Sequence, residues 1–187
     1  MESTADRYRK VAGAFSRRVQ EVPAGAWDNP APCEGWLARD VIRHLVEWMP
    51  GLFFRSAGLD PPAIPSVDDD PVAAWFALDR ALQAALDDPV IAATEFSSQA
   101  GRHTVEAAIE MFGTSDILVH TWDLARATGL DETLDPDEVH GLLAGMEPMD
   151  AVLRQSGHFG PRVDVPADAD EQTRLIAFTG RHPTETS

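Results

Sequence analysis

Cysteine is almost absent from this sequence, which holds a single one, Cys33. One cysteine cannot form a disulfide within the chain, and such scarcity is typical of a reducing compartment. Long apolar runs are also missing, because no stretch approaches the roughly 18 residues of a membrane-spanning helix. The N-terminus, MESTADRYRKV, lacks the apolar core of a signal peptide. We therefore expect a cytoplasmic protein with no membrane partner.

Basic residues are few: 15 lysines and arginines stand against 31 acidic residues, and the formal net charge is −16. Such a chain is repelled by nucleic acids and by anionic membrane surfaces, so neither is an expected partner. The charge is instead a feature that favours solubility. With 187 residues, 44% of them hydrophobic, the chain can build one domain with a sizeable core.

Convincing strand alternation is missing as well. The stretch 90–102 is ambiguous, and only a short run over 163–165 has a β-like pattern. Apolar residues at helical spacing, together with capping signals and prolines, predict helices over residues 4–22, 37–56, 71–86, 104–127, 136–153 and 169–179. We expect Pro50 to kink the second helix or mark its end. The fold class predicted is all-α: an antiparallel four-helix bundle built from the first four helices, with a short C-terminal extension.

Asp116 and His120 form the first candidate for a functional site. They are four residues apart on the predicted helix 104–127, so their side chains lie on one face, roughly 6 Å apart along the axis. That face also carries Ile109, Phe112 and Val119, which predict burial. Because buried carboxylates are rare unless they are paired or bound to a metal, this spacing favours a metal ion.

His44 is the third donor. It follows Val41 by three residues and precedes Trp48 by four, so we expect its imidazole to point into the core. Bundles build metal sites from inward-facing side chains on different helices, and these three residues meet that requirement. The alternative interpretation of His44 is a core histidine with its hydrogen bonds satisfied.

Other residues favour structural interpretations. Cys33 and the tryptophans of the loop 23–36 are expected to be packed in the core. Asp123 could support the metal site behind its ligands, or pair with Arg43 or Arg126. It is interpreted as structural, because a residue three positions along the helix is expected to be poorly placed for bonding the His120 ring.

Several motifs carry a resemblance to a known family. The PCEGW loop leading into LARDVIRHLVEW, the segment SDILVHTWDLARATGL and the closing VDVPADADEQTRLIAFTGRHP resemble the mycothiol-dependent maleylpyruvate isomerase N-terminal family. This family is a bacterial branch of the DinB/YfiT-like four-helix metal-binding proteins, and the resemblance extends over nearly the whole chain. It implies a divalent metal, usually zinc, held by His44, Asp116 and His120, with mycothiol as the thiol cosubstrate.

The chain departs from the isomerase in two ways. Asp116 stands where the isomerase has Glu, which shortens the ligand by one methylene. The isomerase also has a further C-terminal α/β domain, for which residues 158–187 are too few, so maleylpyruvate isomerisation itself is not expected. We expect residues 1–157 to form a DinB-like four-helix bundle with the metal site. Residues 158–187 are expected to form an extension packed on it, with a disordered tail from Arg181 onward.

The chemistry of such a site follows from its ligand count. Three protein ligands leave one coordination position open, which is typical of a catalytic metal. A thiol bound there loses its proton near neutral pH and becomes a nucleophile toward an electrophilic substrate. Two histidines and a carboxylate also suit Fe(II) or Ni(II).

The function predicted is a metal-dependent thiol S-transferase or isomerase. The alternative from another class is a bundle, with or without metal, that has a structural, association or regulatory role. A non-haem iron oxygenase is less favoured, because helical bundles supply such iron with more carboxylates. The sequence leaves the oligomeric state open, including a homodimer.

Overall fold

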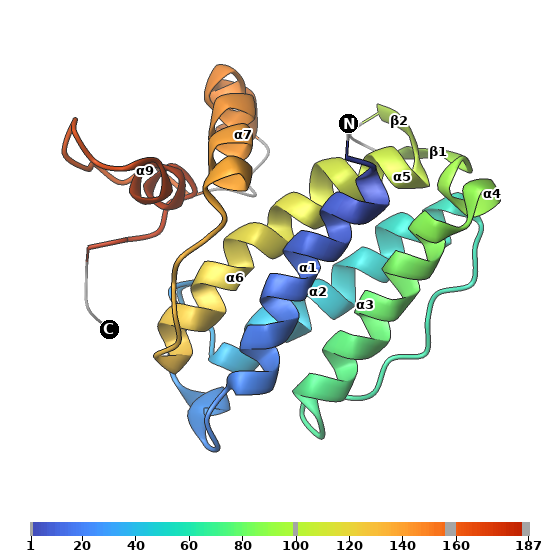
Figure 1. Ribbon diagram of the computed structural model, residues 1–187, viewed down its shortest axis with the longest axis horizontal. Helices are drawn as coiled ribbons and strands as arrows, with labels where there is room; N and C mark the ends of the chain where they lie inside the picture. Colours follow the sequence, from blue (N-terminus) through green and yellow to red (C-terminus); the bar gives the residue numbers. More distant parts are fainter. Residues whose placement is uncertain (1, 99–100, 156–159, 185–187) are drawn as a thin grey trace.

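The computed structural model describes residues 2–98, 101–155 and 160–184, and it is mostly helical (Figure 1). Its long helices are α1 (Thr4–Glu21), α2 (Ala38–Phe53), α3 (Pro71–Asp87) and α6 (Ser115–Thr128). α1 packs against α3 and α6, and α2 packs against the same two helices. The prediction of a mostly helical chain is therefore confirmed.

The helix directions differ in part from the expected antiparallel arrangement. α1 and α6 run in one direction, whereas α2 and α3 run in the other (Figure 1). The contacts α1–α3 and α2–α6 are therefore antiparallel, but α1–α6 and α2–α3 are parallel. The reason is the long connection over residues 58–70, which runs along the side of the helices and returns the chain to the end where α2 began.

The helix ends follow from capping side chains. Ser3 precedes α1, and its hydroxyl accepts a hydrogen bond from the backbone N–H of Asp6 at 3.1 Å. Asp70 caps α3 in the same way, with Pro71 at the first helical position. α2 continues through Pro50 and ends at Phe53, so this proline lies in the last turn of the helix.

The core lies between these helices. Phe15 of α1 meets Trp75 of α3 edge to face, with ring centroids 4.5 Å apart. Val41, Leu45 and Ile117 complete the same interior from α2 and α6, each fully buried. Burial of these apolar side chains is the main source of stability for the fold.

A small hairpin interrupts the helical pattern. After the short helix α4 (Pro89–Ala92), strands β1 (Glu95–Ser98) and β2 (Gly101–Thr104) pair antiparallel. The all-α expectation did not include this hairpin. With four residues in each strand, the pattern was too short to separate from a loop.

The predicted helix 104–127 consists of three segments. They are α5 (Val105–Ala108), a π-helical turn (Ile109–Thr114) and α6. Thr104 caps the start and Gly129, with φ of 72°, ends the helix in the left-handed conformation. The apolar stripe that leads to Asp116 therefore crosses a turn that is wider than an α-helix.

The C-terminal part forms α7 (Pro136–Met146), α8 (Asp150–Gln155) and α9 (Glu171–Phe178), and α7 packs against α9 to one side of the long helices (Figure 1). Short 3-10 turns cover Ala26–Asp28, Arg55–Ala57 and Glu147–Met149. The β-like run 163–165 forms no strand, and the Val163 N–H instead donates to the carbonyl of Ala177 at 3.0 Å.

The predicted boundary between residues 157 and 158 lies outside the described residues, as does the end of the tail, 185–187. The division into two parts therefore stays a prediction. No helix within 2–98, 101–155 and 160–184 is long and apolar enough to cross a membrane.

Candidate metal centre

The structure brings His44, Asp116 and His120 together where α2 and α6 pack against each other. His44 Nε2 lies 3.1 Å from Asp116 Oδ2, and His120 Nε2 lies 3.4 Å from Asp116 Oδ1. One candidate ligand atom from each residue falls within 4.8 Å of the others. The two histidine rings meet nearly edge to face, with centroids 4.9 Å apart.

The cluster lies at the edge of the core. The side chain of His120 is 4% exposed, whereas those of His44 and Asp116 are 34% and 29% exposed. We expected His44 to point into the core, but it is half-buried and borders solvent. The cluster is therefore anchored on its His120 side and reachable from its His44 side.

Asp116 carries a charge that its neighbours stabilise. Burial alone would raise the pKa of this carboxyl, but His120 and a hydrogen bond from His44 outweigh burial and lower it. Trp48, one turn after His44 on α2, donates its indole N–H to Asp116 Oδ2 at 3.1 Å. The carboxylate is therefore ionised at neutral pH and held from α2.

Asp123 holds the buried histidine from behind. Its Oδ2 lies 2.7 Å from His120 Nδ1, and its side chain is fully buried. The expectation that a residue three positions along the helix could not bond the ring was wrong, because i and i+3 side chains are neighbours on a helix surface. Since a carboxylate only accepts, His120 Nδ1 carries a proton, and in the neutral ring the lone pair is then on Nε2, the nitrogen that faces Asp116.

Arg181 is the ion-pair partner of Asp123. Its Nε lies 2.8 Å from Oδ1 and its terminal nitrogen 2.6 Å from Oδ2. The predicted partners are occupied elsewhere, Arg43 with Asp40 and Asp68 and Arg126 with Glu132. Arg181 was also expected to begin a disordered tail, and this expectation was wrong for Arg181 itself.

The ion pair between Asp123 and Arg181 moves both pKa values in the direction that keeps both groups charged. Burial opposes the charge of each group, but the attraction between them outweighs it. The pKa of Asp123 is lowered and that of Arg181 is raised.

Cys33 lies beside this ion pair. Its Sγ is 3.4 Å from the Arg181 guanidinium and 3.8 Å from Asp123 Oδ2. Burial, followed by the charge of Asp123, raises the pKa of the thiol to about 12. Cys33, His120 and Asp123 could also form a group of metal donors. However, the Arg181 guanidinium already supplies the positive charge that a metal ion would bring to Asp123 and Cys33. This second group is therefore the less favoured metal site.

The loop before α2 closes one side of the cluster. The backbone N–H of Trp36 donates to the backbone carbonyl of Cys33, and Gly35 between them has φ of 78°, which permits this tight turn. The turn sets the Trp36 ring against both histidines, stacked on His120 with centroids 5.9 Å apart and tilted on His44 at 5.1 Å. Trp36 therefore forms a wall of the site and is more than a core residue.

The donors fit a divalent cation. Zinc bonds nitrogen and oxygen at about 2.0–2.1 Å, so ligand atoms around a tetrahedral ion lie about 3.3 Å apart. The two carboxylate-to-imidazole distances are close to that separation, 3.1 Å at Asp116 Oδ2 for His44 and 3.4 Å at Oδ1 for His120. When the His120 ring is neutral with its proton on Nδ1, His120 Nε2 and Asp116 Oδ1 are two acceptors 3.4 Å apart, and a cation between them would replace their repulsion with attraction.

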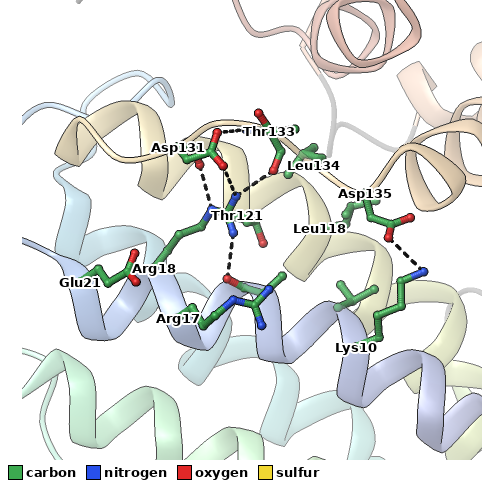
Figure 2. A pocket seen from close by; sticks show the side chains of 12 residues that line it. Lys10, Arg17, Arg18, Glu21, Leu118, Thr121, Asp131, Thr133, Leu134 and Asp135 are labelled. Atoms are coloured by element: carbon green, nitrogen blue, oxygen red, sulfur yellow. Dashed lines mark hydrogen bonds and ion pairs between the residues drawn. The ribbon is translucent and has the colours of Figure 1, made fainter.

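A separate cavity of about 400 Å³ lies between α1, α6 and the segment 131–135 (Figure 2). Leu118 and Thr121 line it from α6, and Arg18 crosses from α1 to donate to the carbonyls of Asp131 and Thr133. Lys10 and Asp135 form an ion pair at its other end, 3.2 Å apart. These contacts join α1 to the segment that leads into α7, and they do not reach the metal donors.

Comparison with known proteins identifies the family of the chain. The profile of the mycothiol maleylpyruvate isomerase N-terminal domain family matches residues 8–125, which include every candidate ligand. The chain belongs to this family. Its similar relatives include two uncharacterized proteins of Mycobacterium tuberculosis, from strains CDC 1551 / Oshkosh and ATCC 25618 / H37Rv. Each is 29% identical over 177 residues, covering 93% of this chain and 95% of the relative. No solved structure matches.

Membership of this family links the chain to mycothiol-related function. The matched region contains Trp48 and Asp123 as well as the three donors, whereas Arg181 lies beyond its end. The part of the site that sequence reasoning missed is therefore the support around the ligands: the two tryptophans, Asp123 and Arg181. A histidine followed three residues later by an aspartate on a predicted helix was the available signal for Asp123.

Proposed function

We propose that this protein holds a divalent metal at His44, Asp116 and His120 and uses it to activate a low-molecular-weight thiol of the mycothiol type. The activated thiol would serve S-transfer to an electrophilic small molecule, or its isomerisation. The observation that carries this proposal is the convergence of two imidazole nitrogens and a charged carboxylate on one point at the edge of the core. Membership of the mycothiol-related family supports the choice of thiol.

The proposal includes the finer description of the fold. The mutual packing of α1, α2, α3 and α6 supports a DinB/YfiT-like four-helix bundle over residues 1–157, with 158–187 as an extension. In this description the ligands come from two helices, which is how bundles build metal sites in their interiors.

The ligand set favours zinc. Two histidines and one carboxylate form a known catalytic zinc set, and three protein ligands leave one position for another molecule. Ni(II) and Fe(II) accept the same donors, so the choice among metals depends on metal availability as well as on the site.

The residues of the chain have distinct roles in this proposal. A bound divalent metal would supply a positive charge that lowers the pKa of a neighbouring thiol, so that a thiolate exists at neutral pH. Asp123 accepts the hydrogen bond from His120 Nδ1 and thereby leaves Nε2 as the ring nitrogen that would bind the metal. Asp116 contributes the negative charge, and Trp36 and Trp48 keep water from two sides of the donors.

Cys33 does not serve as the nucleophile in this scheme. With a pKa of about 12, its thiol stays protonated at neutral pH and is a poor nucleophile. Its Sγ faces the guanidinium of Arg181 and the buried side of the site. The reactive sulfur therefore comes from a separate thiol molecule.

The experiment is a titration of mycothiol into protein loaded with Co²⁺, which absorbs light where zinc does not. Formation of a cobalt–thiolate bond is expected to produce a sulfur-to-metal charge-transfer band that saturates with mycothiol. The matched control is the mycothiol analogue in which a hydroxyl replaces the thiol, which is expected to give no band. A cobalt-loaded protein whose spectrum does not change with mycothiol would contradict thiol activation.

A further inference from the structure

Trp48 contacts the proposed metal centre through Asp116. It lies four residues after His44, so both side chains project from the same face of α2. Both reach the same carboxylate oxygen: the Trp48 indole N–H and His44 Nε2 are each 3.1 Å from Asp116 Oδ2. α2 therefore supplies a candidate metal ligand together with a hydrogen-bond donor for a ligand on α6.

The Trp48 ring is itself held in place by Phe53, which packs against the π-helical turn. The two rings pack edge to face, with centroids 5.3 Å apart. Phe53 in turn lies over Gly113, where a methyl group would come within 3.1 Å of two carbons of the Phe53 ring. The absence of a side chain at Gly113 lets the turn approach α2 this closely.

The same turn sets the direction of Asp116. The π-helical segment ends at Thr114, two residues before this ligand, and widens the helix by one residue. One continuous set of contacts therefore runs from Gly113 through Phe53 and Trp48 to the Asp116 carboxylate. Such π-helical turns occur frequently at functional sites.

We propose that Trp48 is a positioning residue for Asp116, and that the π-helical turn with Gly113 fixes the place of Trp48. This inference rests on the proposed metal centre and assigns a role within it. A carboxylate can rotate about its Cβ–Cγ bond and bind a metal through one oxygen or two. The indole N–H occupies a lone pair of Oδ2, fixes that rotation and favours binding through one oxygen, which leaves a coordination position open for the thiol.

The test compares zinc affinity, by competition with a chromophoric chelator, in the parent protein and in two variants. Trp48→Phe keeps an aromatic ring but removes the N–H donor, and its zinc affinity is expected to fall about tenfold, as is usual when a hydrogen-bond partner of a ligand is lost. The matched control is Trp75→Phe, which makes the same chemical change at an indole between α1 and α3, whose N–H donates to the Ser16 hydroxyl at 2.8 Å. Its affinity is expected to stay within about threefold of the parent.

A second measurement and a third variant separate positioning from general packing. The visible spectrum of the Co²⁺ protein reports coordination number, and Trp48→Phe is expected to weaken its absorption as Asp116 begins to bind through both oxygens. Gly113→Ala leaves Trp48 intact but displaces Phe53, so it is expected to weaken zinc binding in the same direction. This variant decides the matter if Trp48→Phe does not fold, as judged by circular dichroism.

The possible outcomes are distinct. A parent protein that takes up no zinc overturns the metal centre, and the role of Trp48 with it. A parent that binds zinc, together with Trp48→Phe and Gly113→Ala variants of equal affinity, overturns only the positioning role. An equal loss in Trp75→Phe and Trp48→Phe also overturns it, because the loss would then come from weakened core packing and not from the hydrogen bond to Asp116.

Discussion

Asp123 and Arg181, which are 58 residues apart in the sequence, form a buried bidentate ion pair. The Asp123 side chain is fully buried and that of Arg181 is 13% exposed. The same Asp123 oxygen that accepts from Arg181 also accepts from His120 Nδ1. The segment after α9 is thereby connected to a candidate metal ligand on α6 through a single carboxylate.

Arg181→Ala is expected to destabilise the protein by about 3–5 kcal/mol, because it leaves a buried carboxylate without its counter-charge. Urea denaturation in the presence of a chelator measures this loss without a contribution from metal. The matched control is Arg9→Ala, which removes exposed ion pairs with Asp6 and Asp87 and is expected to change stability far less. Equal stability of Arg181→Ala and the parent would contradict the importance of this pair.

Tyr8, the only tyrosine of the chain, is expected to resist ionisation in the folded state. Burial and the negative charge of Asp79, which accepts its hydroxyl at 3.0 Å, raise the pKa of Tyr8 well above its usual value. The unfolded chain titrates near pH 10. Because the folded pKa is the higher one, the stability that neutral Tyr8 contributes is complete below about pH 10 and is lost as pH rises further.

The measurement is tyrosinate absorbance against pH, with circular dichroism recorded on the same samples. The two signals are expected to change together, since Tyr8 ionises only as the protein unfolds. The urea-unfolded protein is the control and should titrate near pH 10. A midpoint near pH 10 while the circular dichroism stays native would show that Tyr8 is neither buried nor paired as described.

Asp116→Asn and Asp116→Glu separate a ligand from a structural aspartate. Asn keeps the shape but removes the charge, so zinc affinity is expected to fall sharply. Glu restores the residue expected from the family and is expected to retain the metal, because Asp116 is 29% exposed and has room toward solvent for one more methylene. Both affinities are measured by competition with a chelator, beside the parent. Asn binding as tightly as Asp would remove Asp116 from the ligand set.

Much of the helical framework was predictable from local chemistry. Asp70 followed by Pro71 fixed the start of α3, and Gly129 fixed the end of α6, because capping depends on residues that are close in sequence. The clustering of His44, Asp116 and His120 was also predictable, since each lies on an inward-facing stripe at helical spacing. The hairpin β1–β2 was not predicted because its strands of four residues are too short to separate from a loop, and the π-helical turn was not predicted because apolar spacing over so few residues does not distinguish it from an α-helix.

The surroundings of the donors were predictable only in part. Arg181 could not be assigned to Asp123, because helical periodicity says nothing about a contact across 58 residues. Asp123 itself was misjudged, although three residues along a helix is a favourable spacing for contact. Trp36 reaches the histidines only because the turn at Gly35 folds its loop back onto α2 and α6. Side-chain direction in such a loop is set by tertiary packing.

Metal content is the most direct measurement of the central claim, that His44, Asp116 and His120 hold a divalent metal. The parent protein and a His120→Ala variant are purified without a metal-affinity column and analysed for zinc, nickel and iron. The account predicts about one metal ion per parent chain, and close to none in a His120→Ala variant that keeps its native circular dichroism. Near-zero metal in the parent, after growth with added zinc, nickel or iron, would contradict it and leave these residues as a hydrogen-bonded network without a metal.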